Sequence, residues 1–361
     1  MKNKIAVEER LRKFREQLSQ KGLDGALVIK RENYIYLSGF TGTSAYLIIT
    51  QEHAVLLTDF RYVEQAAAQA PLYEVVQYQG TLISAMNEVL TTRRVERLGF
   101  EEASITFEKY NEYVSNLSIK EFLPLEGMIE KLRMFKDQFE LEILKKAVQI
   151  ADDAFTHILP YIKPGVAEIE IAAEMEFFMK KAGATGASFE TIVASGNRSS
   201  MPHGVASEKK LEIGDSITID FGAYYQHYCS DMTRTVFLGQ PKNNLIKIYQ
   251  IVLEAQKKSS EGAAAGLLGK EIDFIARDII SKNGFERNFG HGLGHSVGLE
   301  IHENPRFSPS GNMKIENGMV ITVEPGIYVN GLGGVRIEDI ILINDDKPIT
   351  LTQSTKEMII L

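Results

Sequence analysis

The chain of 361 residues is long enough for two domains, because a domain averages roughly 150 residues. Its 44% hydrophobic and 24% charged residues are an ordinary globular composition, which excludes a disordered or collagen-like chain. The formal net charge of −8 at pH 7 and the single cysteine, Cys229, argue against a nucleic-acid partner, an internal disulfide framework and a cysteine-based zinc site.

The beginning of the chain is charged and lacks the apolar core of a signal peptide. No apolar run elsewhere in the sequence approaches the roughly 20 residues that a membrane span requires. We therefore expect a soluble, cytoplasmic protein with no membrane partner.

The first third of the chain alternates helical patterns with short apolar runs. Leu11, Phe14 and Leu18 lie at helical spacing and predict an amphipathic helix over residues 8–20. Apolar runs bounded by turn residues predict strands over residues 26–29, 34–37, 46–49, 55–57, 75–78 and 98–100. We therefore predict an α/β domain over residues 1–125 and a second domain over residues 126–361, with a linker near 123–127.

The second domain begins with two predicted helices. Apolar residues between Leu141 and Ile158 recur at i, i+3 and i+4 spacing, as on the buried face of a long helix. Pro164-Gly165 interrupts this pattern, and a further helix is predicted over residues 168–181.

Two segments of this domain repeat in the same order. LEIGDSITIDFG (211–222) resembles IENGMVITVEPG (315–326), and the helical pattern over 163–183 resembles the one over 264–284. The copies lie about 100 residues apart in both cases, which indicates an internal duplication. Duplicated halves would pair about a pseudo-twofold axis and bring Asp220 and Glu324 face to face.

Four acids interrupt the strand-like segments of the duplicated region. Asp220 and Glu338 lie inside apolar runs, and Glu324 ends another. A hairpin turning around Tyr225-Gln226 would bring Asp231 beside Asp220. Carboxylates in apolar strands are costly unless they are paired or bound to a cation, so these acids are candidate ligands.

Each of these residues alone has an ordinary structural explanation. Glu338 could pair with Arg336, and the histidines His291, His295 and His302 could belong to a solvated loop. Taken together, four acids and one imidazole suit hard or borderline divalent ions such as Mn, Co, Fe or Zn. Two such ions would neutralise the four negative charges, so the sequence predicts a two-metal site.

Five segments follow one another in the chain in this order: ITIDFGA, SDMTRT, GHSVGLEIHENP, TVEPG and GVRIED. In these segments the chain resembles the metal-dependent pita-bread peptidases, specifically the Xaa-Pro group of aminopeptidase P and prolidase. ENYIYLSGFTG and LLTDFRY resemble the creatinase-like amino-terminal domain of those enzymes, so the match covers essentially the whole chain. It implies an α/β (α+β) fold in which a creatinase-like α/β domain precedes a duplicated pita-bread catalytic domain.

Position by position, the resemblance also assigns roles. The metal ligands fall on Asp220, Asp231, His295, Glu324 and Glu338, of which Asp231 and Glu338 bridge both ions. The substrate-facing residues fall on His203, His291, His302 and Arg336. The implied cofactor is a pair of divalent metal ions, with Mn as the first choice and Co, Zn or Fe as alternatives. The implied assembly is a homodimer.

The chemistry of such a site suggests how each residue would serve hydrolysis. Divalent ions would activate water and polarise the scissile carbonyl. Glu324 is the candidate proton shuttle to the leaving proline nitrogen, and His302 is the candidate donor to the oxyanion. We expect His291 and His203 to border the pocket for the pyrrolidine ring, and the free amine of the substrate to lie beside Asp220.

Several functions compete on the sequence alone. The first is an Xaa-Pro aminopeptidase, which releases the first residue of peptides with proline second. The close rival is an Xaa-Pro dipeptidase (prolidase), which needs a cationic or hydrogen-bonding stop for the dipeptide's carboxylate. A non-enzymatic peptide-binding homologue or a metal-independent creatine amidinohydrolase is disfavoured, because all five ligand positions are filled. Proline-containing peptides are therefore the expected partners.

Overall fold

The structure is a computed structural model that describes residues 2–345 and 347–361. The chain forms two compact units, of which the first ends at Arg133 and the second spans Met134–Leu361. The division into domains at residues 125 and 126 remains a prediction. Among the described residues, we find no helix with the length and apolar character of a membrane span.

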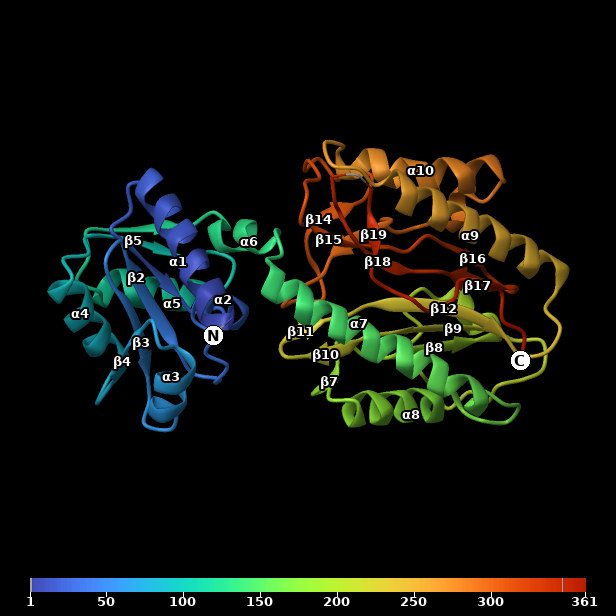
Figure 1. Cartoon of the computed structure of the whole chain (residues 1–361), viewed down its shortest axis with the longest axis horizontal. Coiled ribbons are helices and arrows are strands. Elements are labelled where there is room, and N and C mark those ends of the chain that lie inside the picture. The colour runs from blue at the N-terminus through green and yellow to red at the C-terminus, as the bar shows by residue number, and fades with distance from the viewer. Residues whose placement is uncertain (1, 346) are drawn as a thin grey trace. The chain divides into compact units, whose positions relative to one another are not determined.

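The first unit is built on a mixed six-stranded sheet with the order β4-β3-β2-β1-β5-β6 (Figure 1). Its strands are β1 (Gly25–Val28), β2 (Tyr46–Thr50), β3 (Ala54–Thr58), β4 (Glu74–Gln77), β5 (Arg97–Phe100) and β6 (Glu121–Pro124). Its helices are α1 (Lys2–Gln20), α2 (Arg31–Ser38), α3 (Val63–Gln69), α4 (Leu82–Thr92), α5 (Phe107–Asn116) and α6 (Met128–Arg133). Leu27, Met86 and Tyr113 belong to its buried core.

Two details of the predicted first domain are wrong. Residues 34–37 form part of α2 and not a strand. All four of these residues are buried, so the run has no polar position from which a helical period could be recognised. Gly39 ends α2 in the left-handed conformation, with φ 78°. The predicted linker near 123–127 begins inside β6, which extends to Pro124.

The first half of the second unit pairs two helices with antiparallel strands. Its helices are α7 (Gln138–Ile158) and α8 (Glu168–Lys181), as predicted, and the short 3₁₀ segments η1 (Leu159–Tyr161) and η2 (Gly196–Ser200). Its strands are β7 (Gly186–Ala187), β8 (Ile192–Ser195), β9 (Ser216–Phe221), β10 (Ala223–Tyr225), β11 (Tyr228–Cys229) and β12 (Met232–Phe237). Ile150 of α7 and Met175 of α8 share a core with Ile219 of the sheet β12-β9-β8.

The second half repeats this plan. Its helices are α9 (Asn243–Gly262), α10 (Gly269–Lys282) and η3 (Glu286–Asn288). Its strands are β13 (Gly294–Ser296), β14 (Glu303–Phe307), β15 (Val320–Val323), β16 (Gly326–Val329), β17 (Gly333–Arg336), β18 (Asp339–Leu342) and β19 (Ile349–Thr350). Val252 of α9 and Ile272 of α10 share a core with Ile321 of the sheet β14-β13-β15-β18-β19. The strands of the second unit lie between the helix pairs α7/α8 and α9/α10 (Figure 1).

The order of elements matches the predicted duplication. In each half a helix pair is followed by an antiparallel strand pair, β9 with β12 and β15 with β18. Asp220 lies in β9, and Glu324 directly follows the equivalent strand β15. The repeated architecture therefore places an acidic residue at an equivalent position in both halves.

Candidate metal centre

A tight turn brings the first two acids together. β10 and β11 pair antiparallel, and the residues between them, Gln226 and His227, have φ values of 46° and 72°. Two successive positive φ angles are typical of a type I′ hairpin turn. The predicted hairpin is thus present, with its turn one residue later than expected. It returns the chain so that Asp231, directly before β12, lies close to Asp220 in β9.

The other two acids lie where strands end. Glu324 follows β15, and Glu338 lies between β17 and β18, so the run 335–342 is two strands and not one. The backbone N–H of Glu338 donates to the carbonyl of Thr233 at 3.1 Å. This break in pairing turns the carboxylate of Glu338 toward the acids of the first half.

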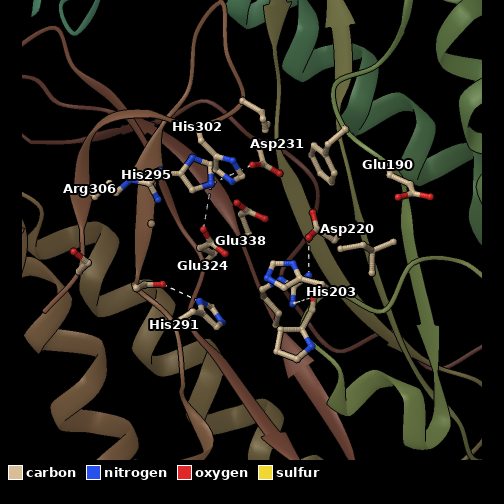
Figure 2. A pocket seen from close by; sticks show the side chains of 18 of the residues that line it. Glu190, His203, Asp220, Asp231, His291, His295, His302, Arg306, Glu324 and Glu338 are labelled. Carbon is tan, nitrogen blue, oxygen red and sulfur yellow. Dashed lines mark hydrogen bonds and ion pairs between the residues drawn. The ribbon is translucent and has the colours of Figure 1, made fainter. Parts of the chain in front are cut away.

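The five predicted ligands meet in one place (Figure 2). Asp220, Asp231 and Glu338 each offer an oxygen within 4.8 Å of the others. The Nε2 atom of His295 lies 3.6 Å from Asp231 Oδ2 and 3.4 Å from Glu324 Oε1. Four carboxyl groups and one imidazole thus converge from both halves of the fold.

Burial and the repulsion between neighbouring carboxylates make ionisation of these acids unfavourable. Burial raises the pKa of Asp231 and Glu338 well above their usual values, and the neighbouring carboxylates raise them further. Burial also raises the pKa of Glu324 to about 8. Such a group of acids holds its full negative charge at neutral pH only when cations share the site.

Two atoms of the site are arranged for a cation. The Nδ1 atom of His295 lies 3.2 Å from the carbonyl of Ser296, and burial lowers the pKa of His295 to about 3, so its neutral ring directs a lone pair on Nε2 at the acids. The Oδ1 atom of Asp220 is buried and has no hydrogen-bond partner among the described residues. Four carboxylates and one imidazole are the donors that hard or borderline divalent ions prefer. The residues present therefore fit divalent metal ions.

Arg336 connects three parts of the site. It pairs with Asp220 through Nη2 at 2.6 Å, and not with Glu338 as the alternative explanation of the sequence required. Its Nε donates to the hydroxyl of Thr233 at 3.0 Å, and that hydroxyl donates to Glu338 Oε2 at 2.7 Å. Its Nη1 donates to the carbonyl of Pro202 at 3.1 Å, directly before His203. One buried guanidinium thus positions two acids and the segment that carries His203.

Tyr328 links this arginine to His291. Arg336 Nη1 donates to the Tyr328 hydroxyl at 2.8 Å, and that hydroxyl lies 2.9 Å from His291 Nε2. Burial raises the pKa of Tyr328 to about 12, so its proton is available to His291. The carbonyl of Gly292 lies 2.8 Å from His291 Nδ1, and burial lowers the pKa of His291 to about 4. His291 is therefore a neutral ring with both nitrogens engaged, which presents its faces to neighbouring groups.

The acids open into a pocket of about 520 Å³ within the second unit. Its walls include the predicted residues His203, His291 and His302 (Figure 2). They also include Arg306 and Glu190, which were not predicted from the sequence. Arg306 has a sequence signal, a lone cation four residues after His302, but Tyr328, Thr233 and Glu190 have none, because only the fold brings them to the site.

A duplicated α/β unit with four carboxylates and one imidazole converging at a pocket is the arrangement expected of a metal-dependent hydrolase. Comparison with known families agrees with this class. Residues 142–345 match the model of metallopeptidase family M24, and residues 10–135 match the creatinase/prolidase N-terminal domain. The chain belongs to metallopeptidase family M24 and is a metallopeptidase.

Three relatives illustrate the similarity. The solved structure of a protein named Xaa-Pro dipeptidase from Bacillus anthracis is 48% identical, with a TM-score of 0.96 over 98% of this chain and 100% of that one. The crystal structure of a protein named X-Pro aminopeptidase from Thermotoga maritima is 36% identical, with a TM-score of 0.91 over 96% and 100% of the two chains. A protein named Xaa-Pro dipeptidase from Pyrococcus horikoshii is 41% identical, over 98% of this chain and 99% of its own length. The predicted fold is thereby confirmed.

Proposed function

We propose that this metallopeptidase hydrolyses the Xaa-Pro bond and that dipeptides are its main substrates. The observation that carries the preference for dipeptides is the guanidinium of Arg306, which lines the pocket and makes no hydrogen bond or ion pair with any side chain in the described ranges. Such a group is the cationic stop that a dipeptide's terminal carboxylate needs. The names of the relatives from Bacillus anthracis and Pyrococcus horikoshii support the same function.

An Xaa-Pro aminopeptidase is the second candidate. It is the function that the sequence alone favours, and the name of the Thermotoga maritima relative supports it. An aminopeptidase must leave room beyond the proline for the rest of the peptide. Arg306 is exposed, so its side chain could move aside for a longer substrate. The two candidates therefore differ in whether Arg306 is needed.

The five converging residues would hold two divalent ions, with Asp231 and Glu338 shared between them. Manganese is our first choice because the donor set is rich in carboxylates, and Co, Zn or Fe are alternatives. Ions bound there would supply Lewis acidity, which polarises a carbonyl and lowers the pKa of water. A homodimer remains the expected assembly, which rests on the family resemblance, and a cytoplasmic location remains a separate expectation.

The side chains of the pocket have distinct tasks in this hydrolysis. Glu324 accepts a proton from the attacking water and passes it to the proline nitrogen as that nitrogen leaves. His302 packs edge-on against His295 with ring centroids 4.4 Å apart, and burial lowers its pKa, so it meets the substrate as a neutral ring that donates to the developing oxyanion.

Two further histidines shape the pocket for proline. His291 has both nitrogens engaged, so it offers a ring face to the pyrrolidine. His203 is held by the hydrogen bond from Arg336 to the preceding carbonyl of Pro202. Asp220 places negative charge where the free amine of the substrate would lie.

The test compares Ala-Pro with Ala-Pro-Gly in the wild type and in Arg306→Ala. We expect the substitution to lower kcat/KM for Ala-Pro about 30-fold, because a charge-assisted hydrogen bond to the carboxylate is lost, and to change kcat/KM for Ala-Pro-Gly less than about threefold. Arg287→Ala is the matched control, since Arg287 is exposed and does not line the pocket. Equal losses on both substrates, or no loss on the dipeptide, would favour the aminopeptidase.

A further inference from the structure

The charged groups of the pocket are separated across the acid cluster. Arg306 lies on one side of the five predicted ligands, and Glu190 lies on the opposite side, beyond Asp220 (Figure 2). A dipeptide that directs its terminal carboxylate at Arg306 would extend its first residue toward Asp220 and Glu190. The environment of Glu190 therefore influences which side chain is preferred at the first residue of the substrate.

The local backbone directs Glu190 into the pocket. The hydroxyl of the next residue, Thr191, donates to Glu176 of α8 at 2.8 Å, so Thr191 faces the helix. Its neighbours Glu190 and Ile192 both line the pocket. Ile192 is paired with Asp220 in the register of β8 and β9, and directly paired residues project from the same face of a sheet. Glu190 thus belongs to the wall beside Asp220.

The carboxylate of Glu190 has no partner of its own. Across residues 2–345 and 347–361 no hydrogen bond or ion pair engages it, and its side chain is exposed to the pocket. The apolar side chains of Phe189, Ile192 and Val205 line the same pocket, and Val205 pairs with Ile192 in an isolated β-bridge. An apolar wall that ends in a free carboxylate suits a long side chain with apolar methylenes and a cationic tip.

We propose that Glu190 is a specificity-determining residue, which forms the subsite for the residue before proline and favours Lys or Arg there. The inference rests on the proposed function, because it assigns a subsite to the Xaa side chain of an Xaa-Pro substrate. It does not depend on peptide length, since the residue before proline occupies this subsite in dipeptides and in longer peptides.

The experiment measures kcat/KM for Lys-Pro and for Met-Pro, whose side chains have similar length, and takes their ratio. Glu190→Gln keeps the shape and removes the charge, and we expect it to lower the ratio about fivefold, as for a partly screened charge pair. Glu208→Gln is the control, because Glu208 is exposed in the same unit and outside the pocket, and its ratio should equal that of the wild type. The same measurements are made with Lys-Pro-Gly and Met-Pro-Gly.

Two further readouts decide the outcome. Added NaCl should lower the Lys/Met ratio of the wild type but leave that of Glu190→Gln unchanged, and Glu190→Lys should shift the preference toward Glu-Pro over Gln-Pro. A ratio that is the same in the wild type and in Glu190→Gln, with both enzymes active, overturns the subsite and leaves the proposed function intact. A wild type that cleaves no Xaa-Pro substrate overturns the proposed function, and the subsite with it.

Discussion

At the scale of single residues, the site depends on groups that are not ligands. Arg336 contacts Asp220, Thr233 and Tyr328, and the hydroxyl of Tyr328 in turn contacts His291. The Tyr328 hydroxyl accepts from the guanidinium, so its own proton is directed at the imidazole. A single phenol thus positions an arginine that pairs with an acid and selects the tautomer of a pocket histidine.

Tyr328→Phe should remove both hydrogen bonds and leave the ring in place. We expect kcat/KM for an Xaa-Pro substrate to fall about tenfold, because a hydrogen bond to a charged group is lost, with metal content unchanged. Metal content is measured by elemental analysis alongside the kinetics. Tyr161→Phe, at an exposed tyrosine outside the pocket, is the control. If metal content fell together with kcat/KM, Tyr328 would instead be needed to hold the metal ligands in position.

At the scale of elements, the strand that carries His295 must run very close to β15. A Cβ atom built on Gly294 would lie 2.0 Å from the carbonyl oxygen of Thr322, and backbone cannot move aside as a flexible side chain can. This close approach also lets the Thr322 hydroxyl accept from the backbone N–H of His295 at 3.0 Å. The glycine thereby fixes the depth at which the imidazole enters the site.

Gly294→Ala should destabilise the second unit by about 2 kcal/mol or more, the cost of forcing an atom into packed structure. Gly290→Ala is the matched control, because a Cβ atom there meets nothing within 4 Å. Urea unfolding, followed by a probe in the second unit, compares the two variants with the wild type. Equal midpoints for the two variants would show that β13 can shift away from β15.

Much of this element-scale picture could be predicted from the sequence, and the failures have physical causes. The long helices and β9 carry clear periodic or continuous apolar patterns, and the duplication placed Asp220 and Glu324 in equivalent positions. Burial on all sides hid the helical period of α2. Periodicity also could not locate the break at Glu338, where pairing with the other half of the fold interrupts an apolar run. Tyr328 and Glu190 reach the pocket through tertiary contacts that no local pattern encodes.

At the scale of the whole molecule, buried acids occur in both units, and they respond to pH. In the first unit Glu101 accepts from the backbone N–H groups of Ile29 and Lys30 and from the side chain of Asn33. Burial nevertheless raises its pKa to about 7. A carboxyl group whose pKa is higher in the folded state than in the unfolded chain stabilises the folded state at pH values below its unfolded pKa, which is near 4.5. This stabilisation is lost as the pH rises to about 7.

The first unit should therefore lose about 3 kcal/mol of stability between pH 4.5 and 7 through Glu101 alone. Hydrogen exchange of residues 25–38, corrected for the intrinsic pH dependence of exchange, reports this local stability. Glu101→Gln has no titrating group at this position, so its protection should change less over the same range. The same pH dependence in the variant and in the wild type would assign the effect to another group.

The second unit brings together four carboxylates from two halves of a duplicated fold, and this concentration of negative charge is what two cations would stabilise. X-ray diffraction from manganese-loaded crystals, recorded on both sides of the metal's absorption edge, tests this most directly. We predict two anomalous peaks among the five residues, with Asp231 and Glu338 contacting both ions. In the Asp231→Asn variant we predict that the pair of peaks and the hydrolytic activity are both lost. A single peak, or ions bound away from these carboxylates, would contradict the two-metal centre.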